Sequence, residues 1–133
     1  SLDALERSGV AYVELALDHP AHCAVMFARA AADLRRRADA SPQVRASHSA
    51  GHAAFDGLVQ LIAAAQRDGF VREGDPEEFA CIAWCTTHGI ATLAMQRMLD
   101  GDEEVPWDRE TTLAFTRRAL ANLSRGFAPD RGA

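Results

Sequence analysis

Residues 75–101 read DPEEFACIAWCTTHGIATLAMQRMLDG and contain the most completely bounded helix pattern in the chain. Asp75 and Pro76 suit the N-cap and the first helical position, and Asp100 with Gly101 suits the end. Apolar side chains occur nearly all round this segment, and such a helix must be buried on more than one side. We therefore predict a central helix that packs against its own domain and against a second copy of the chain.

Four further segments repeat apolar residues at three- and four-residue spacing, at about residues 2–18, 21–38, 42–68 and 109–125. Proline suits the start of two of them, and Asp108 suits the N-cap of the last. Gly69 and Gly126 suit two helix ends. The sequence thus predicts an all-α fold, a single domain of about five helices over residues 1–127, followed by a disordered tail at 128–133.

Composition narrows the class of protein. A chain of 133 residues with 48% hydrophobic and 25% charged residues matches one soluble globular domain. The net charge of -5 and the lack of a long basic stripe make the chain itself a poor nucleic-acid binder. With no signal peptide and no apolar run near the roughly 20 residues that span a bilayer, we expect no membrane partner. An odd count of 3 cysteines without framework spacing favours buried thiols in the reducing cytoplasm.

Motifs for catalysis and cofactor binding are missing from the sequence. It has no Gly-x-Ser-x-Gly elbow, no phosphate loop and no dinucleotide fingerprint, so we predict neither an enzyme nor a cofactor. His48 and His52 have the spacing of a metal-binding pair, but no pattern supplies the other ligands. Two more clusters, Cys81–Cys85–His88 and His19–His22–Cys23, match no metal motif either, and we predict no metal.

Large aromatic and polarizable side chains lie on helices that must meet inside the domain. Most of them suit a packed core, but they also suit the lining of an apolar cavity with Tyr12, Thr87 and His88 as polar groups. His88 follows Trp84 by one turn on the inner face, where a histidine needs a hydrogen-bond partner or a ligand. The predicted ligand-binding residues are Tyr12, Met26, Phe27, Phe55, Val59, Trp84, Thr87, His88 and Met95.

The segment WCTTHGIATL at residues 84–93 resembles the tryptophan and histidine-glycine signature of the WHG-type C-terminal domain of TetR-family transcriptional regulators. AYVELALDHP at residues 11–20, with Met26 and Phe27, resembles the opening of that domain. Residues 68–76 resemble the linker before its central helix. The likeness extends over about residues 5–127.

This resemblance implies an all-helical domain that binds a ligand and forms a homodimer. The last two long helices, about residues 76–100 and 108–125, would form a four-helix bundle with their mates from a second subunit. The interface residues expected on this basis are Phe79, Ala83, Ile90, Leu93, Ala94, Phe115, Ala119 and Leu123. The helix-turn-helix module that reads operator DNA in this family has no counterpart here, so operator DNA would be bound only through that absent N-terminal module.

The mechanism implied is a coupling between a small-molecule effector and DNA affinity. A mostly apolar molecule enters the cavity between the first four helices, the first helix shifts, and a coupling free energy of roughly 1–3 kcal/mol changes operator binding. Two alternatives stay open. One is a helical dimerisation module with a packed core and no ligand, and the other is a metal-dependent protein that uses the histidine clusters.

Overall fold

The computed structural model describes residues 2–27, 36, 39–99 and 107–130, without the side chains of residues 47 and 48. Helices are the only regular secondary structure among these residues, which confirms the predicted all-α class. The helices are α1 (Leu2–Asp18), α2 (Pro20–Phe27), α4 (Pro42–Arg67), α5 (Pro76–Met95) and α6 (Arg109–Phe127).

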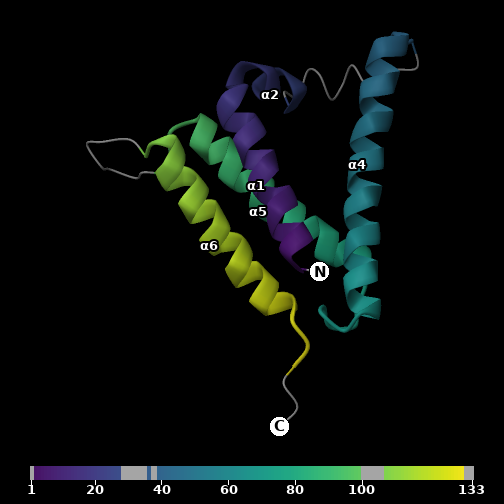
Figure 1. Cartoon of the computed structure of the whole chain (residues 1–133). Helices are drawn as coiled ribbons and strands as arrows, with labels where there is room; N and C mark the ends of the chain where they lie inside the picture. Colours follow the sequence, from purple (N-terminus) through teal and green to yellow (C-terminus); the bar gives the residue numbers. More distant parts are fainter. Residues whose placement is uncertain (1, 28–35, 37–38, 100–106, 131–133) are drawn as a thin grey trace.

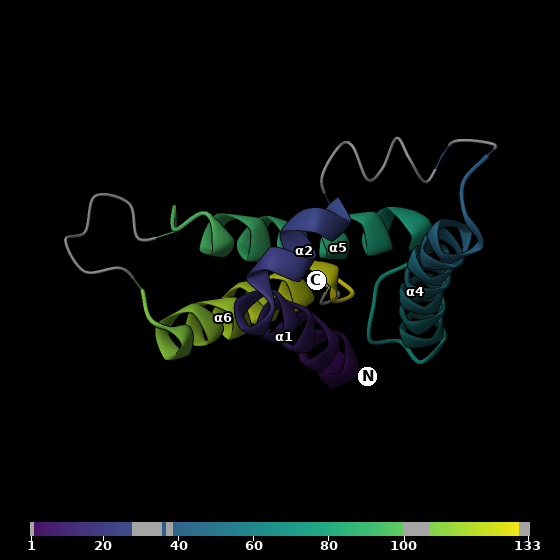
Figure 2. The ribbon, with the colours of Figure 1, turned by 90° about the horizontal axis from the view of Figure 1, so that it is seen from above.

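Helices α1, α5 and α6 run alongside one another, and α4 lies beside the first half of α5 (Figures 1 and 2). Helix α2 covers the end of α1 (Figure 1). Helix α1 packs against α2, α4, α5 and α6, whereas α5 packs against α1, α4 and α6. Within one chain the central position therefore belongs to α1, because one face of α5 stays exposed.

The predicted helix starts are confirmed by their capping hydrogen bonds. The Asp75 carboxylate accepts a bond from the backbone N–H of Glu77 at 2.9 Å, and the Asp108 carboxylate accepts one from Thr111 at 2.7 Å. These bonds satisfy backbone donors that have no partner inside the helix. Both signals are local, which is why the sequence is sufficient to place them.

The end of α4 is also the predicted one. Gly69 has φ 75°, the backbone N–H of Phe70 donates to the carbonyl of Ala65 at 2.9 Å, and that of Gly69 donates to Gln66 at 3.0 Å. This is a Schellman cap, which needs a left-handed residue after the helix. The apolar contact that usually accompanies such a cap is made by Val71, which is 2% exposed in the core, and not by Phe70, which follows Gly69 directly and is 49% exposed.

Helix α5 ends earlier than predicted. It stops at Met95, because Arg97 has φ 56° and the N–H of Met98 donates to the carbonyl of Leu93 at 2.9 Å. The hydrogen bonds are those of the α4 end, with an arginine in the left-handed position where α4 has a glycine. The sequence predicts the end of this helix from Asp100 and Gly101, and it contains no glycine at position 97. Residues 100–101 lie outside the described part of the chain.

The predicted end of α6 at Gly126 is wrong by a short distance, since the helix continues to Phe127. Phe127 is buried and its ring lies 4.8 Å from that of Phe79. Its carbonyl accepts a hydrogen bond from the N–H of Arg72 at 2.8 Å. These contacts hold the last turn in helical conformation. Most of the predicted second half of α2, and residues 131–133 of the predicted tail, fall outside the described residues.

Two apolar clusters form the core, and α1 and α5 contribute to both. The Phe79 cluster contains the buried residues Leu5, Ile62, Ala65, Val71, Phe79, Ala80, Ala83 and Phe127. The Val13 cluster contains Val13, Ala16, Cys23, Ile90, Ala91 and Leu113. Burying a side chain as large as valine or leucine stabilises a fold by roughly 1.5–3 kcal/mol, so these clusters fix how the helices pack.

Candidate ligand cavity and dimer face

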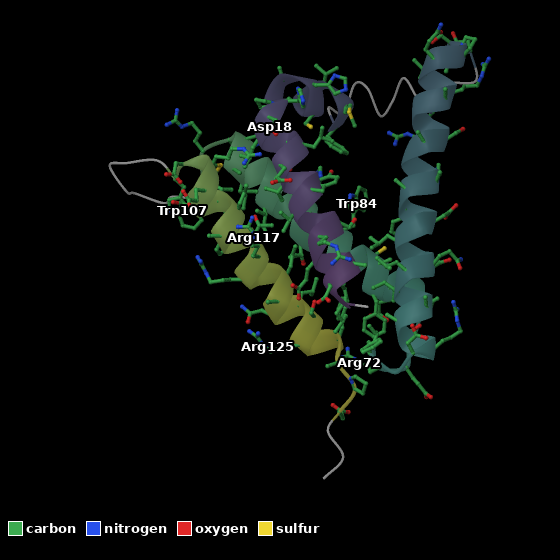
Figure 3. The ribbon with its side chains drawn as sticks, in the orientation of Figure 1. Asp18, Arg72, Trp84, Trp107, Arg117 and Arg125 are labelled. Atoms are coloured by element: carbon green, nitrogen blue, oxygen red, sulfur yellow. The ribbon has the colours of Figure 1, made fainter. Side chains whose placement is uncertain are left out.

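A small cavity lies between α1, α4, α5 and α6. Its volume is about 60 Å³. Figure 3 shows Trp84, one of its lining residues, between α1 and α4. The lining is mostly apolar and consists of Leu5, Ser8, Gly9, Tyr12, Leu58, Ala83, Trp84, Thr87 and Leu120.

Helix α1 supplies the largest share of this lining. Leu5, Ser8, Gly9 and Tyr12 follow one another at helical spacing, so they share one face. Of these the sequence prediction included only Tyr12. A Cβ atom at Gly9 would lie 2.6 Å from Leu120 Cδ1, so the absence of a side chain lets α6 approach α1. In the sequence, the small residues Ser8 and Gly9 within an apolar stripe are the signal from which this part of the lining could be predicted.

A row of rings extends from the cavity. The ring of Phe55 lies 6.2 Å from Trp84, and Trp84 lies 5.8 Å from His88. His88 in turn lies 4.5 Å from Phe27 and 6.2 Å from Tyr12. Pairs of rings at such distances attract each other. The structure thus brings together predicted residues from four helices, and Trp84 and Phe27 remain 44% and 38% exposed.

Tyr12 and His88 form the hydrogen bond at the centre of this row. The Tyr12 hydroxyl lies 2.9 Å from Nδ1 of His88 and joins α1 to α5. Burial lowers the pKa of His88 and raises that of Tyr12, although a hydrogen bond from the Trp84 indole acts in the opposite direction on the Tyr12 pKa. Both groups are therefore neutral near pH 7.

The remaining predicted ligand residues divide into two groups. Thr87 lines the cavity, but its hydroxyl donates to the carbonyl of Ala83 at 2.8 Å, so its hydrogen is not available to a ligand. Met26, Val59 and Met95 do not line the cavity. Val59 packs on the Phe79 cluster and Met95 on the Val13 cluster.

The predicted dimer residues also divide. Phe79, Ala83 and Ile90 are 4%, 3% and 7% exposed and pack within the chain's own core. The α6 members Phe115, Ala119 and Leu123 are half-buried against the two clusters. Ala94 is half-buried and Leu93 is 39% exposed. The side chains that a second copy could contact are therefore the half-buried and exposed members of the predicted set.

The exposed face of α5 carries residues that the prediction assigned elsewhere or left out. Ile82 is 39% exposed, and a Cβ added at Gly89 would meet nothing within 4 Å. Cys81 and Cys85 are exposed too, so the prediction of buried thiols is right for Cys23 and wrong for these two. No Asp, Glu, Lys or Arg occurs in the sequence from 79 to 96, which leaves the exposed face uncharged over almost five turns.

Metal ligands do not gather in the described part of the chain. No group of three or more His, Cys, Asp and Glu side chains there could hold a metal ion. The side chain of His48, one of the predicted pair, lies outside that part. Nδ1 of His88 is occupied by Tyr12. No helix among the described residues is both long and apolar enough to cross a membrane.

The described helices form a bundle with a small, mostly apolar cavity beside the first helix. The family model for the tetracyclin repressor-like C-terminal domain matches residues 5–127, and the chain belongs to this family. Transcription regulation follows from the family, whose members are domains of regulators and not of enzymes. The predicted resemblance is thereby confirmed.

A solved structure has the same fold. It is that of a protein with unknown function from Rhodococcus sp. RHA1, with 29% sequence identity and a TM-score of 0.67. The similarity covers 96% of this chain and 73% of that one. No curated protein matches the chain.

Proposed function

We propose that this chain is the effector-binding and dimerisation domain of a TetR-like regulator in the cytoplasm. A small, mostly apolar molecule binds between α1, α4, α5 and α6 and alters the DNA affinity of a helix-turn-helix module joined to α1. The observation that carries the proposal is the cavity, which is lined by residues of four helices and continues into the row of rings.

The size of the cavity sets a condition on binding. Its 60 Å³ is well below the roughly 150 Å³ that accommodates benzene in an engineered protein cavity. An effector must therefore displace side chains as it enters. Trp84 and Phe27 are suited to this movement because they are 44% and 38% exposed and their outer faces are not held by the core.

Helix α1 is the element that would transmit the change. It contributes Leu5, Ser8, Gly9 and Tyr12 to the cavity and packs against every other described helix. A ligand that enlarges the cavity pushes on α1 and so favours one position of this helix. Differential binding to two positions of α1 supplies a coupling of roughly 1–3 kcal/mol, enough for a 5- to 150-fold change in DNA affinity.

Binding of a ligand can be tested through the fluorescence of Trp84. A Trp107→Phe substitution removes the other tryptophan, which packs on Phe115 away from the cavity. We expect isopropylbenzene to change the Trp84 emission saturably at sub-millimolar concentration. Ser8→Phe, which places a ring at the cavity lining, should abolish the change, and Ala11→Phe, on the same helix but outside the lining, should not. Without a saturable change in the parent, the packed dimerisation module becomes the better interpretation.

Dimerisation rests on the uncharged outer face of α5. We expect the chain to sediment as a dimer at micromolar concentration and the double variant Ile82→Glu, Leu93→Glu to sediment as a monomer. A charge buried in an interface without a partner is strongly unfavourable. Val25→Glu and Phe70→Glu are matched controls, since both residues are more exposed and lie off this face. Dissociation by the controls, or a dimeric double variant, would refute this interface.

A further inference from the structure

We propose that the cavity selects a neutral effector with a hydrogen-bond donor, such as an alcohol or an N–H group, over a ketone or a carboxylate of the same shape. Thr87 and Tyr12 are the residues that determine this specificity, and His88 positions the Tyr12 hydroxyl. The inference rests on the proposed function, because it describes the same cavity.

The first support is the direction of the Thr87 hydrogen bond. Its Oγ1 donates to the carbonyl of Ala83 at 2.8 Å, and the residue is only 6% exposed. Oγ1 also faces α1, since it would lie 3.3 Å from a Cβ at Gly9. A hydroxyl has one hydrogen and two lone pairs. With the hydrogen committed to its own helix, Thr87 can offer the cavity only an acceptor.

The second support is the direction of the bond between Tyr12 and His88. The Tyr12 hydroxyl lies 2.9 Å from Nδ1 of His88, and the tautomer of the ring decides which of the two groups donates. We assign Tyr12 as donor to Nδ1, with the imidazole hydrogen on Nε2. With this assignment the Tyr12 hydrogen is committed to His88, and the Tyr12 oxygen keeps a lone pair.

The third support is the charge of the lining. It includes no acidic or basic residue, and burial lowers the pKa of neighbouring His88, so this ring stays neutral near pH 7. A carboxylate would lose its hydration without gaining a cation. Ser8 is the exception among the polar lining residues, because its exposed hydroxyl can rotate to donate or accept.

The test compares two probes that differ by two hydrogens. In the Trp107→Phe protein, 1-phenylethanol can donate a hydrogen bond and acetophenone can only accept one. We expect the alcohol to bind roughly five- to tenfold more tightly, since Thr87 and Tyr12 present only lone pairs to the ketone oxygen. Benzoate should not bind measurably at pH 7.

Variants separate this specificity from a structural effect. Thr87→Val keeps the side-chain shape, and we expect it and Tyr12→Phe each to lower the alcohol-to-ketone affinity ratio to about one or two. His88→Phe keeps a ring but removes the acceptor for Tyr12, which frees the hydroxyl to donate into the cavity. Acetophenone should then gain affinity, a reversal that simple loss of packing would not produce. Ala11→Ser, on α1 but outside the lining, should leave the ratio unchanged.

The outcomes distinguish the two proposals. Binding of isopropylbenzene together with equal affinities for alcohol and ketone would overturn the specificity and leave the effector-binding function in place. Tighter binding of acetophenone or benzoate in the parent would do the same. If isopropylbenzene, 1-phenylethanol and acetophenone all fail to bind, the proposed function fails and the specificity with it.

Discussion

The two faces of α5 both lack Asp, Glu, Lys and Arg but lie in different surroundings. On the inner face Ala80, Ala83 and Ala91 are 0%, 3% and 1% exposed. On the outer face Ile82 and Leu93 are each 39% exposed. The inner face carries alanines because α1, α4 and α6 of the same chain lie against it. The outer face is just as uncharged, yet none of the described helices covers it in a comparable way.

Two glycines make this difference measurable. Gly9 of α1 lies opposite the inner face, where an added Cβ would lie 2.6 Å from Leu120 and 3.3 Å from Thr87 Oγ1. Gly89 lies on the outer side of α5, where an added Cβ would meet nothing within 4 Å. A glycine inside a helix costs roughly 1 kcal/mol relative to alanine. Packing within the chain explains that cost at Gly9 and leaves it unexplained at Gly89.

The largest effect is expected for Gly9→Val. Leu120 is 2% exposed and held by the core, so the added branches cannot be accommodated by moving its side chain into solvent. We expect the free energy of unfolding in urea to fall by about 2–3 kcal/mol, the upper part of the usual range for an overpacked core. Gly57→Val is the control, because Gly57 is an open glycine within α4, and should change stability by less than about 0.5 kcal/mol. Equal losses in both variants would mean that α1 and α6 are not closely packed at Gly9.

The same comparison explains which parts of the fold could be predicted from the sequence. Helix starts at Asp75 and Asp108 depend on bonds within three residues, and the Gly69 end depends on one left-handed residue. Such signals are contained in a short segment. The end of α5 was mispredicted because Arg97 adopts the conformation expected of glycine.

The faces of α5 were harder to predict, because apolar residues surround the helix and one residue step rotates the face by about 100°. Ala83 and Ile90 were assigned outward and pack inward, while Ile82 was not assigned and is exposed. Of the predicted ligand residues, Tyr12, Trp84 and Thr87 line the cavity, and the two aromatic ones have chemistry that is recognisable in the sequence. Ser8 and Gly9 were missed because their role depends on the distance between helices, which no local pattern records.

The second prediction is that Gly89→Ala has opposite effects on monomer and dimer. In the monomeric Ile82→Glu, Leu93→Glu background it should raise the free energy of unfolding by about 1 kcal/mol, since alanine is the better helix former and the space is open. With Ile82 and Leu93 intact, Gly89→Ala should weaken the dimer about tenfold, because the added methyl group would lie between α5 and the helix of the second subunit that packs on it.

Gly57→Ala is the matched control for that experiment. It should give the same gain in the monomer without a change in the dimer dissociation constant, as measured by sedimentation. If Gly89→Ala instead strengthens the dimer, or leaves it unchanged, the partner helix does not pass over Gly89. The outer face would then lack the close contact that its small residues favour.

A third prediction concerns Arg97, which follows the end of α5. Arg97 at φ 56° and Gly69 at φ 75° occupy the same position in the caps of α5 and α4. A side chain in this conformation costs roughly 1–2 kcal/mol, partly offset because glycine gives the unfolded chain more freedom. We expect Arg97→Gly to raise stability by about 0.5–1 kcal/mol and Gly69→Ala to lower it by about 1 kcal/mol in thermal unfolding. A loss with Arg97→Gly would show that the arginine side chain makes a contact that outweighs its backbone strain.

The smallest expected effect is a pH dependence from His88, which lies between the two faces. Burial lowers its pKa below the ordinary value of 6.5, so between these two values the unfolded chain binds more protons than the folded one. Stability therefore rises with pH through this window, is complete above about pH 6.5 and decreases as the pH falls below it. His88→Asn keeps an acceptor for Tyr12 but does not titrate, so its unfolding free energy should depend less steeply on pH from 6.5 downward. Parallel curves for parent and variant would mean that His88 is as well hydrated in the folded chain as in the unfolded one, and the ring row would then be open to water.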